Sequence, residues 1–80
     1  MEIILNNIKY HIHDSGLEAY VLANNYKGDI IIPPYIQHDG QLWIAVTGIA
    51  YAAFRDCEEL TSVSLPEGLS TIESRAFAGC

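Results

Sequence analysis

Basic side chains are scarce in this chain of 80 residues. Four lysines and arginines stand against ten aspartates and glutamates, which gives a net charge of −6 at pH 7. Nucleic acids and anionic lipid surfaces are bound mainly through lysine and arginine. We therefore expect neither nucleic acid nor an anionic membrane surface as a partner, and the ordinary role of such a charge is solubility.

Long apolar runs are also lacking. No run approaches the roughly 20 residues of a transmembrane helix, so we expect no membrane insertion by this segment. The opening stretch Met1–Leu5 contains Glu2 and is followed by two asparagines. It is too short and too acidic for a signal peptide, so we expect any export signal to lie outside these residues.

Signatures of enzymes and cofactor sites are missing too. The six glycines are scattered singly, which excludes a Gly-rich phosphate loop. There is no G-x-S-x-G around a serine and no C-x-x-C pair for zinc. We expect a protein that is not an enzyme and holds no cofactor or metal.

The histidines are the remaining candidates for a metal site or for catalysis. His11 and His13 would share one face of a strand, and Asp14 or the distant pair His38 and Asp39 would have to complete the site. Only two of the three or four necessary ligands are fixed locally. We therefore predict that His11 and His13 lie on an exposed polar face of a strand. The competing hypothesis is a metal protein or an enzyme that uses the histidines.

The first half of the chain has the pattern of β-structure. Residues 8–13 alternate apolar and polar side chains, residues 14–16 are typical of a turn, and residues 17–22 form a return strand, which together predict a hairpin. Residues 29–32 are a short strand that ends at two prolines, since proline cannot donate to a ladder. After a predicted turn at residues 38–41, residues 42–47 alternate again, with Leu42, Ile44 and Val46 on one side.

The second half of the chain repeats itself after 23 residues. Residues 46–57 align with residues 69–80, with identical isoleucine, alanine, phenylalanine and cysteine at matching positions. Such a period, with L-x-x-V-x-L at residues 60–65, is typical of leucine-rich repeats. Residues 50–55 and 74–78 are predicted to be single helical turns. The expected inward-facing repeat core is Ile49, Phe54, Cys57, Leu60, Val63, Leu65, Leu69, Ile72, Phe77 and Cys80.

The string A-F-x-x-C-x-x-L-x-x-V-x-L-P, which runs from Ala53 to Pro66, resembles BspA-type leucine-rich repeats. The resemblance covers residues 46–80 well and residues 29–33 loosely, although the usual glycine after the repeat isoleucine is Ala50 in one copy and Glu73 in the other. It implies a leucine-rich-repeat solenoid, mainly β with short helical turns, whose parallel-sheet repeats of 23 residues serve binding rather than chemistry. It also implies a cell-surface or secreted protein of bacteria or of some parasitic protists, with a role in adhesion.

The domain organisation follows from where the motif begins. We expect residues 1–28 to form an N-terminal β-hairpin cap and residues 29–80 to form leucine-rich repeats: an irregular first repeat, one full repeat and one truncated repeat. A cap is needed because the first repeat would otherwise expose an apolar edge and an unpaired strand. Since the second echo stops at a standard repeat position, we expect the N-terminal part of a longer array.

The two cysteines, Cys57 and Cys80, occupy the same repeat position. Buried cysteine behaves as a small hydrophobe, so a core ladder is the first interpretation. A disulfide between them is the alternative, which export to an oxidising environment would favour.

Trp43 alternates with Leu42 and Ile44 and is expected to face away from the main core. Either Trp43 forms an exposed cluster with Ile31, Tyr20 and Tyr35, which is a common kind of anchor for protein or glycan contacts, or the N-terminal hairpin covers it. The outward-facing Ser62 and Ser64 would add a shallow binding face.

These observations point to a non-catalytic protein–protein interaction module. The expected partner is a protein or glycan on a host or neighbouring cell. The alternative is a purely structural cap or spacer of a repeat array that binds elsewhere.

Overall fold

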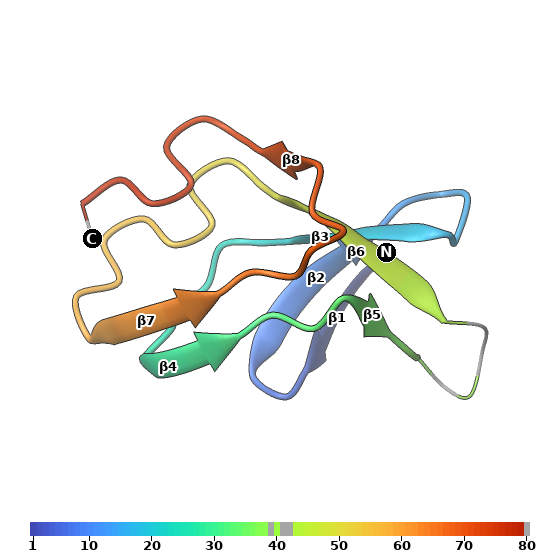
Figure 1. Ribbon diagram of the computed structural model, residues 1–80, viewed down its shortest axis with the longest axis horizontal. Helices are drawn as coiled ribbons and strands as arrows, with labels where there is room; N and C mark the ends of the chain where they lie inside the picture. The colour runs from blue at the N-terminus through green and yellow to red at the C-terminus, as the bar shows by residue number, and fades with distance from the viewer. Residues whose placement is uncertain (39, 41–42, 80) are drawn as a thin grey trace.

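Eight strands and the turns between them form the computed structural model, which describes residues 1–38, 40 and 43–79 (Figure 1). None of these residues is helical, and no helix of the described chain is long and apolar enough to cross a membrane. The strands are β1 (Glu2–Leu5), β2 (Ile8–Ile12), β3 (Glu18–Val21), β4 (Gly28–Ile31), β5 (Tyr35–Ile36), β6 (Ile44–Ile49), β7 (Leu60–Ser64) and β8 (Thr71–Ile72).

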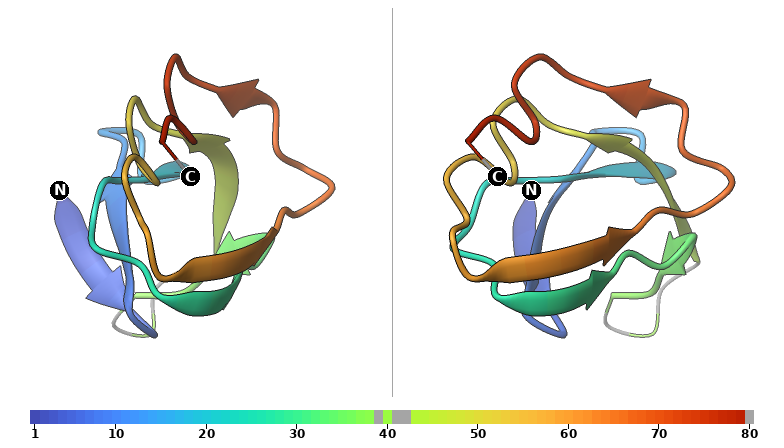
Figure 2. Two further views of the ribbon diagram at one scale, coloured as in Figure 1. Left: turned by 90° about the vertical axis from the view of Figure 1, so that its left-hand side faces the viewer. Right: turned by 60° about the vertical axis from the view of Figure 1, so that its left-hand side comes forward.

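The strands make two sheets that curl around a common core (Figure 2). The large sheet has the order β1-β2-β3-β6-β5, and β8 also pairs with β6. Its β1, β2 and β3 are antiparallel neighbours, whereas β6 runs parallel to both β3 and β8. The small sheet consists of β4 and β7, which are parallel. Each time the chain has wound once around the core, its next strand therefore runs parallel to the strand of the previous turn, as in the pairs β3–β6, β4–β7 and β6–β8.

The predicted hairpin is present as β2 and β3. Alternate residues of β2 are buried, and Gly16 has the positive φ of 73° that the turn requires. Strand β1 was not predicted, because Ile4 is apolar although its side chain is 63% exposed. The sequence of this strand therefore does not alternate apolar and polar residues. It joins β2 through Asn6 and Asn7, whose φ angles of 47° and 68° suit the tight hairpin turn that asparagine tolerates.

The predicted strands at residues 29–32 and 42–47 are present as β4 and β6. Ile44 and Val46 are buried as the alternation required, and Leu42 lies outside the described residues. Residues 39 and 41 of the predicted turn at residues 38–41 also lie outside them, while Gly40 has a positive φ of 71°. The two-residue strand β5, which pairs antiparallel with the beginning of β6, was too short to be predicted.

Three aromatic rings pack against one another through the core, one pair tilted by 37° and the other parallel, and we call them the aromatic stack. Phe54 lies between Tyr26, at a centroid distance of 4.7 Å, and Phe77, at 5.1 Å with nearly parallel rings. Tyr26 and Phe54 are almost fully buried, and Phe77 is partly buried against the core. The backbone follows the same alignment, because the Phe54 amide donates to the Ala76 carbonyl at 2.7 Å. Offset aromatic pairs of this kind add to the stabilisation that burial already provides.

The hydroxyl group of Tyr26 fastens this stack to the hairpin. It donates to the Leu22 carbonyl at 2.6 Å and accepts from the Lys9 amide at 3.2 Å. Burial raises the pKa of Tyr26, and it raises the pKa of the neighbouring Tyr10 to about 12, so both phenols stay neutral at physiological pH. The buried oxygen is therefore satisfied, as buried polar atoms must be.

The helical turns predicted at residues 50–55 and 74–78 are wrong. Both segments are series of tight turns, and Ala52 and Arg75 within them have positive φ, as does Asp56 directly after the first. The physical reason lies in the backbone hydrogen bonds. The amides of residues 52, 54 and 56 donate to the carbonyls of residues 74, 76 and 78, so they are not available to a helix.

The predicted repeat core is buried unevenly. Ile49, Phe54 and Cys57 are buried, while Leu60, Val63, Leu69 and Phe77 are partly buried and pack against the core. The prediction that Leu65 and Ile72 point into the core is wrong, since they are 45% and 51% exposed. In the described chain β7 pairs only with β4 and β8 only with β6, so no further strand covers that end of the fold. Cys80 lies outside the described residues.

The aromatic stack yields a stability prediction. Phe54→Ala removes a fully buried ring between two others, and we expect a loss of about 3–5 kcal/mol in the free energy of unfolding. Tyr51→Ala is the matched control, because this neighbouring ring is 54% exposed, and its effect should stay within about 0.5 kcal/mol. Urea denaturation followed by circular dichroism measures both. Equal stability of the two variants would contradict the role given to the stack.

Candidate functional site

The outward side of the small sheet carries the first candidate surface. Asp29 pairs with Ser62 and Ile31 pairs with Ser64 across β4 and β7, and all four side chains are exposed. We call these four residues the outer strand face. Ile31, the last residue of β4, is 71% exposed, which is high for an isoleucine in a paired strand. The face thus combines one aliphatic side chain with hydroxyls and a carboxylate on a backbone fixed by the ladder.

Asp29 organises the hydroxyls of this face. Its Oδ1 accepts hydrogen bonds from Thr61 Oγ1 at 2.6 Å and from Ser62 Oγ at 2.8 Å. These two bonds lower the pKa of Asp29, because they favour its ionised form. Sequence reasoning selected Ser62 but missed its partner, since Asp29 lies 33 residues earlier and the visible period is 23.

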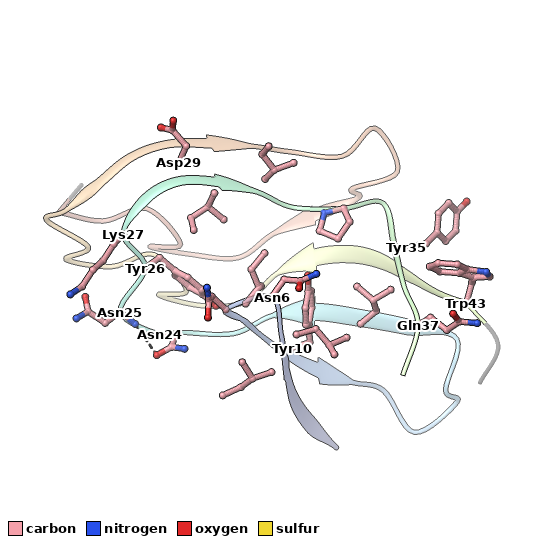
Figure 3. A pocket seen from close by; sticks show the side chains of 18 residues that line it. Asn6, Tyr10, Asn24, Asn25, Tyr26, Lys27, Asp29, Tyr35, Gln37 and Trp43 are labelled. Atoms are coloured by element: carbon pink, nitrogen blue, oxygen red, sulfur yellow. Dashed lines mark hydrogen bonds between the residues drawn. The ribbon is translucent and has the colours of Figure 1, made fainter. Parts of the chain in front are cut away.

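Trp43 and Tyr35 are exposed at 62% and 57%, respectively, so the N-terminal hairpin does not cover Trp43. They lie near each other at one end of an open groove (Figure 3). Tyr20 does not join them. Its ring packs 4.7 Å from that of His13 and lies over Gly48, where a side-chain Cβ would come within 2.5 Å of it.

The groove has a volume of about 980 Å³. It lies between the β1–β2 turn, residues 24–27, β4 with its exposed Ile31, and the described residues Pro33, Tyr35, Ile36, Gln37 and Trp43. Five carboxamide side chains contribute to its wall: Asn6, Asn7, Asn24, Asn25 and Gln37. In Figure 3 Asn24 and Asn25 lie at the end opposite to Trp43, with Asn6 between. Sequence reasoning missed this surface because its asparagines come from two separate turns.

Within the described part of the chain, the histidines do not assemble with further ligands. The rings of His11 and His13 are 5.6 Å apart. Across residues 1–38, 40 and 43–79, no group of three or more histidine, cysteine, aspartate or glutamate side chains is placed to hold a metal ion. Asp39, one of the suggested ligands, lies outside the described residues.

Cys57 is a buried thiol. Its Sγ lies 3.4 Å from the Asn24 carbonyl oxygen, as a weak hydrogen-bond donor. The suggested partner Cys80 lies outside the described residues, so the alternative of a disulfide stays a hypothesis.

The outer strand face yields a pH prediction. The lowered pKa of Asp29 means that its hydrogen bonds stabilise the fold above the ordinary value of 3.8, and that this contribution is lost as the pH falls through the lowered pKa. Ser62→Ala should raise the Asp29 pKa toward 3.8, whereas Ser64→Ala should not change it. Carboxyl NMR titration measures both. An Asp29 pKa of 3.8 or higher in the unaltered chain would contradict this account.

Comparison with known proteins identifies the second half of the chain. The model of the BspA type Leucine rich repeat region (6 copies) matches residues 41–80, which is half of the chain. Comparisons with curated proteins and with solved structures gave no match. The matched segment includes β6, β7, β8 and both turn series. The resemblance expected from the motif is confirmed, and the chain belongs to the BspA-type leucine-rich-repeat family.

Proposed function

We propose that this chain is a non-catalytic protein–protein interaction module, part of a cell-surface or secreted leucine-rich-repeat protein. The observation that carries the proposal is the outer strand face. Ile31 is 71% exposed there, between an ordered carboxylate and serine hydroxyls. Exposed apolar side chains within a polar surround are typical of interaction sites. Family membership supports the same function, since leucine-rich repeats generally mediate protein binding.

The proposed architecture is the beginning of a solenoid with repeats of 23 residues. Ser70 bonds to Thr47, and Ile72 pairs with Ile49, each at a separation of 23 residues. The separation between Asp29 and Ser62 is 33 residues, so the first circuit of the core is longer. We assign residues 29–80 to the repeats on this basis, with the extra residues of the irregular first repeat inserted before β6.

Residues 1–28 are proposed to be the cap of this array. Strands β1 and β2 extend the large sheet beyond β3 in antiparallel fashion, unlike the parallel pairings of β6. Ile8, Tyr10 and Ile12 of β2 are buried in the common core. The edge of β3, which would otherwise be free, is thereby paired with β2.

The proposed partner is a protein or glycan on a host or neighbouring cell, which makes adhesion the cellular role. Support comes from the family and from the exposure of the candidate surfaces. A purely structural role, with binding elsewhere in the array, is the second candidate. The buried Tyr26 hydroxyl favours it, because the hydrogen bonds of this group link the hairpin to the core.

Two pairs of variants test the binding role. Ile31→Asp and Ser64→Arg alter the outer strand face, while Leu17→Asp and Ser74→Arg make the same changes at exposed turn positions. Captured partners from host matrix and cell-surface extracts are identified by mass spectrometry, and their affinities are then measured. We expect about tenfold weaker binding for the first pair, equivalent to about 1.4 kcal/mol, and no change for the controls.

The structural alternative predicts a different result. If no partner binds, or if all four variants bind equally well, the outer strand face is not the interaction site. The structural role would then be the better account of these residues.

A further inference from the structure

The groove differs from the rest of the molecule in charge. The chain carries a net charge of −6, but among the described residues that line the groove only Lys27 and Asp29 are charged. Within the described residues, this acidic protein thus has a hollow whose wall carries no net charge and combines carboxamides and aromatic rings with aliphatic side chains. The complementary ligand is an uncharged molecule with many hydrogen-bonding groups.

Carboxamides are suited to one kind of uncharged ligand. Each asparagine or glutamine side chain offers a carbonyl acceptor and two N–H donors in one plane. A sugar presents hydroxyls that also donate and accept, so adjacent hydroxyls match a carboxamide. Five carboxamides spread along the groove would contact several successive sugar units.

The aromatic end supplies the complementary apolar contact. Trp43 and Tyr35 lie together there and keep more than half of their surface exposed (Figure 3). The face of an aromatic ring carries partial negative charge and attracts positively polarised edges. The C–H groups on the flat side of a pyranose ring provide such an edge. Stacking at one end and hydrogen bonding along the wall are therefore both available.

Local structure accounts for part of the asparagine content, but not for all of it. Asn6 and Asn7 occupy positive φ positions, which asparagine tolerates, and Asn24 Oδ1 accepts the backbone amide of Asn25. The Asn25 side chain does not take part in this hydrogen bond, to which Asn25 contributes only its backbone amide. Its carboxamide lies at the groove wall beside Lys27 (Figure 3).

We propose that this groove binds a neutral oligosaccharide, with Trp43 and Tyr35 stacking on a sugar ring and the asparagines binding its hydroxyls. The inference rests on the proposed function, because it names the chemical class of one adhesive ligand. An extended peptide is the competing occupant, since β1 and β4 border the groove. The edge of β4 that faces away from β7 is short, however, because Pro33 follows the strand and has no N–H to donate.

Trp43 makes the test direct, because it is the only tryptophan of the chain. The 80-residue chain is titrated with neutral hexasaccharides of glucose, mannose, galactose and N-acetylglucosamine while tryptophan fluorescence is recorded. A heparin hexasaccharide and an uncharged octapeptide rich in serine and threonine are titrated in parallel. We expect a saturable change with at least one neutral hexasaccharide and with neither of the other two probes.

Variants that keep Trp43 locate the site. Tyr35→Ala and Asn25→Ala should each weaken binding by about tenfold, whereas Tyr51→Ala, an exposed tyrosine outside the groove, should bind like the unaltered chain. Circular dichroism checks that every variant is folded. The proposal is overturned if no neutral hexasaccharide gives a saturable change, if the octapeptide binds instead, or if both groove variants bind normally.

Failure of this proposal is distinguishable from failure of the proposed function. Ser64 belongs to the outer strand face and does not line the groove. If Ser64→Arg abolishes protein capture while no sugar binds, the interaction module stands and the oligosaccharide groove falls. If sugar binding is normal in Ser64→Arg and no protein is captured, the groove stands without a protein partner.

Discussion

Successive segments of this chain must lie in register, because Phe54 packs between Tyr26 and Phe77 while its amide donates to Ala76. Neither segment of tight turns has enough hydrogen bonds of its own to be stable alone. They stabilise each other, because alternate amides of the first segment donate to carbonyls of the second, and because each segment adds a ring to the stack. The parallel pairing of β6 with β3 and β8 follows from the same alignment.

The alignment also decides which surfaces are available for binding. Because β4 and β7 are held parallel, alternate side chains of both strands point outward, and Asp29 meets Thr61 and Ser62 there. The Tyr26 hydroxyl links the hairpin to the core. The groove lies between the β1–β2 turn and β4. Both candidate surfaces therefore depend on contacts made inside the core, and the buried Tyr10 and Tyr26 also form part of the groove lining.

Much of the fold could be predicted from the sequence where the period is regular. Phe54 and Phe77 stand out because they recur with the same neighbours, and the hairpin of β2 and β3 follows from alternation. Tyr26 could not be recognised as part of the stack, since it is a different residue at a longer spacing. The turns at residues 50–55 were misread as helical because their cross-segment hydrogen bonds are not encoded in local propensity.

The candidate surfaces were predictable only in part. Trp43 and Ile31 were selected from strand alternation, and both are exposed. The carboxamides of the groove come from the segments after β1, β3 and β5, and only the three-dimensional arrangement brings them to one wall. The role of Asp29 depends on the register of β4 against β7, which the irregular first circuit conceals.

The most direct test of this account is a nuclear Overhauser experiment on the aromatic side chains. The stack predicts cross-peaks between the rings of Tyr26 and Phe54 and between those of Phe54 and Phe77, whose centroids are 4.7 Å and 5.1 Å apart. Cross-peaks between the two phenylalanines without any to Tyr26 would contradict the claim. The repeats would then be in register with each other, but the N-terminal segment would not be aligned with them.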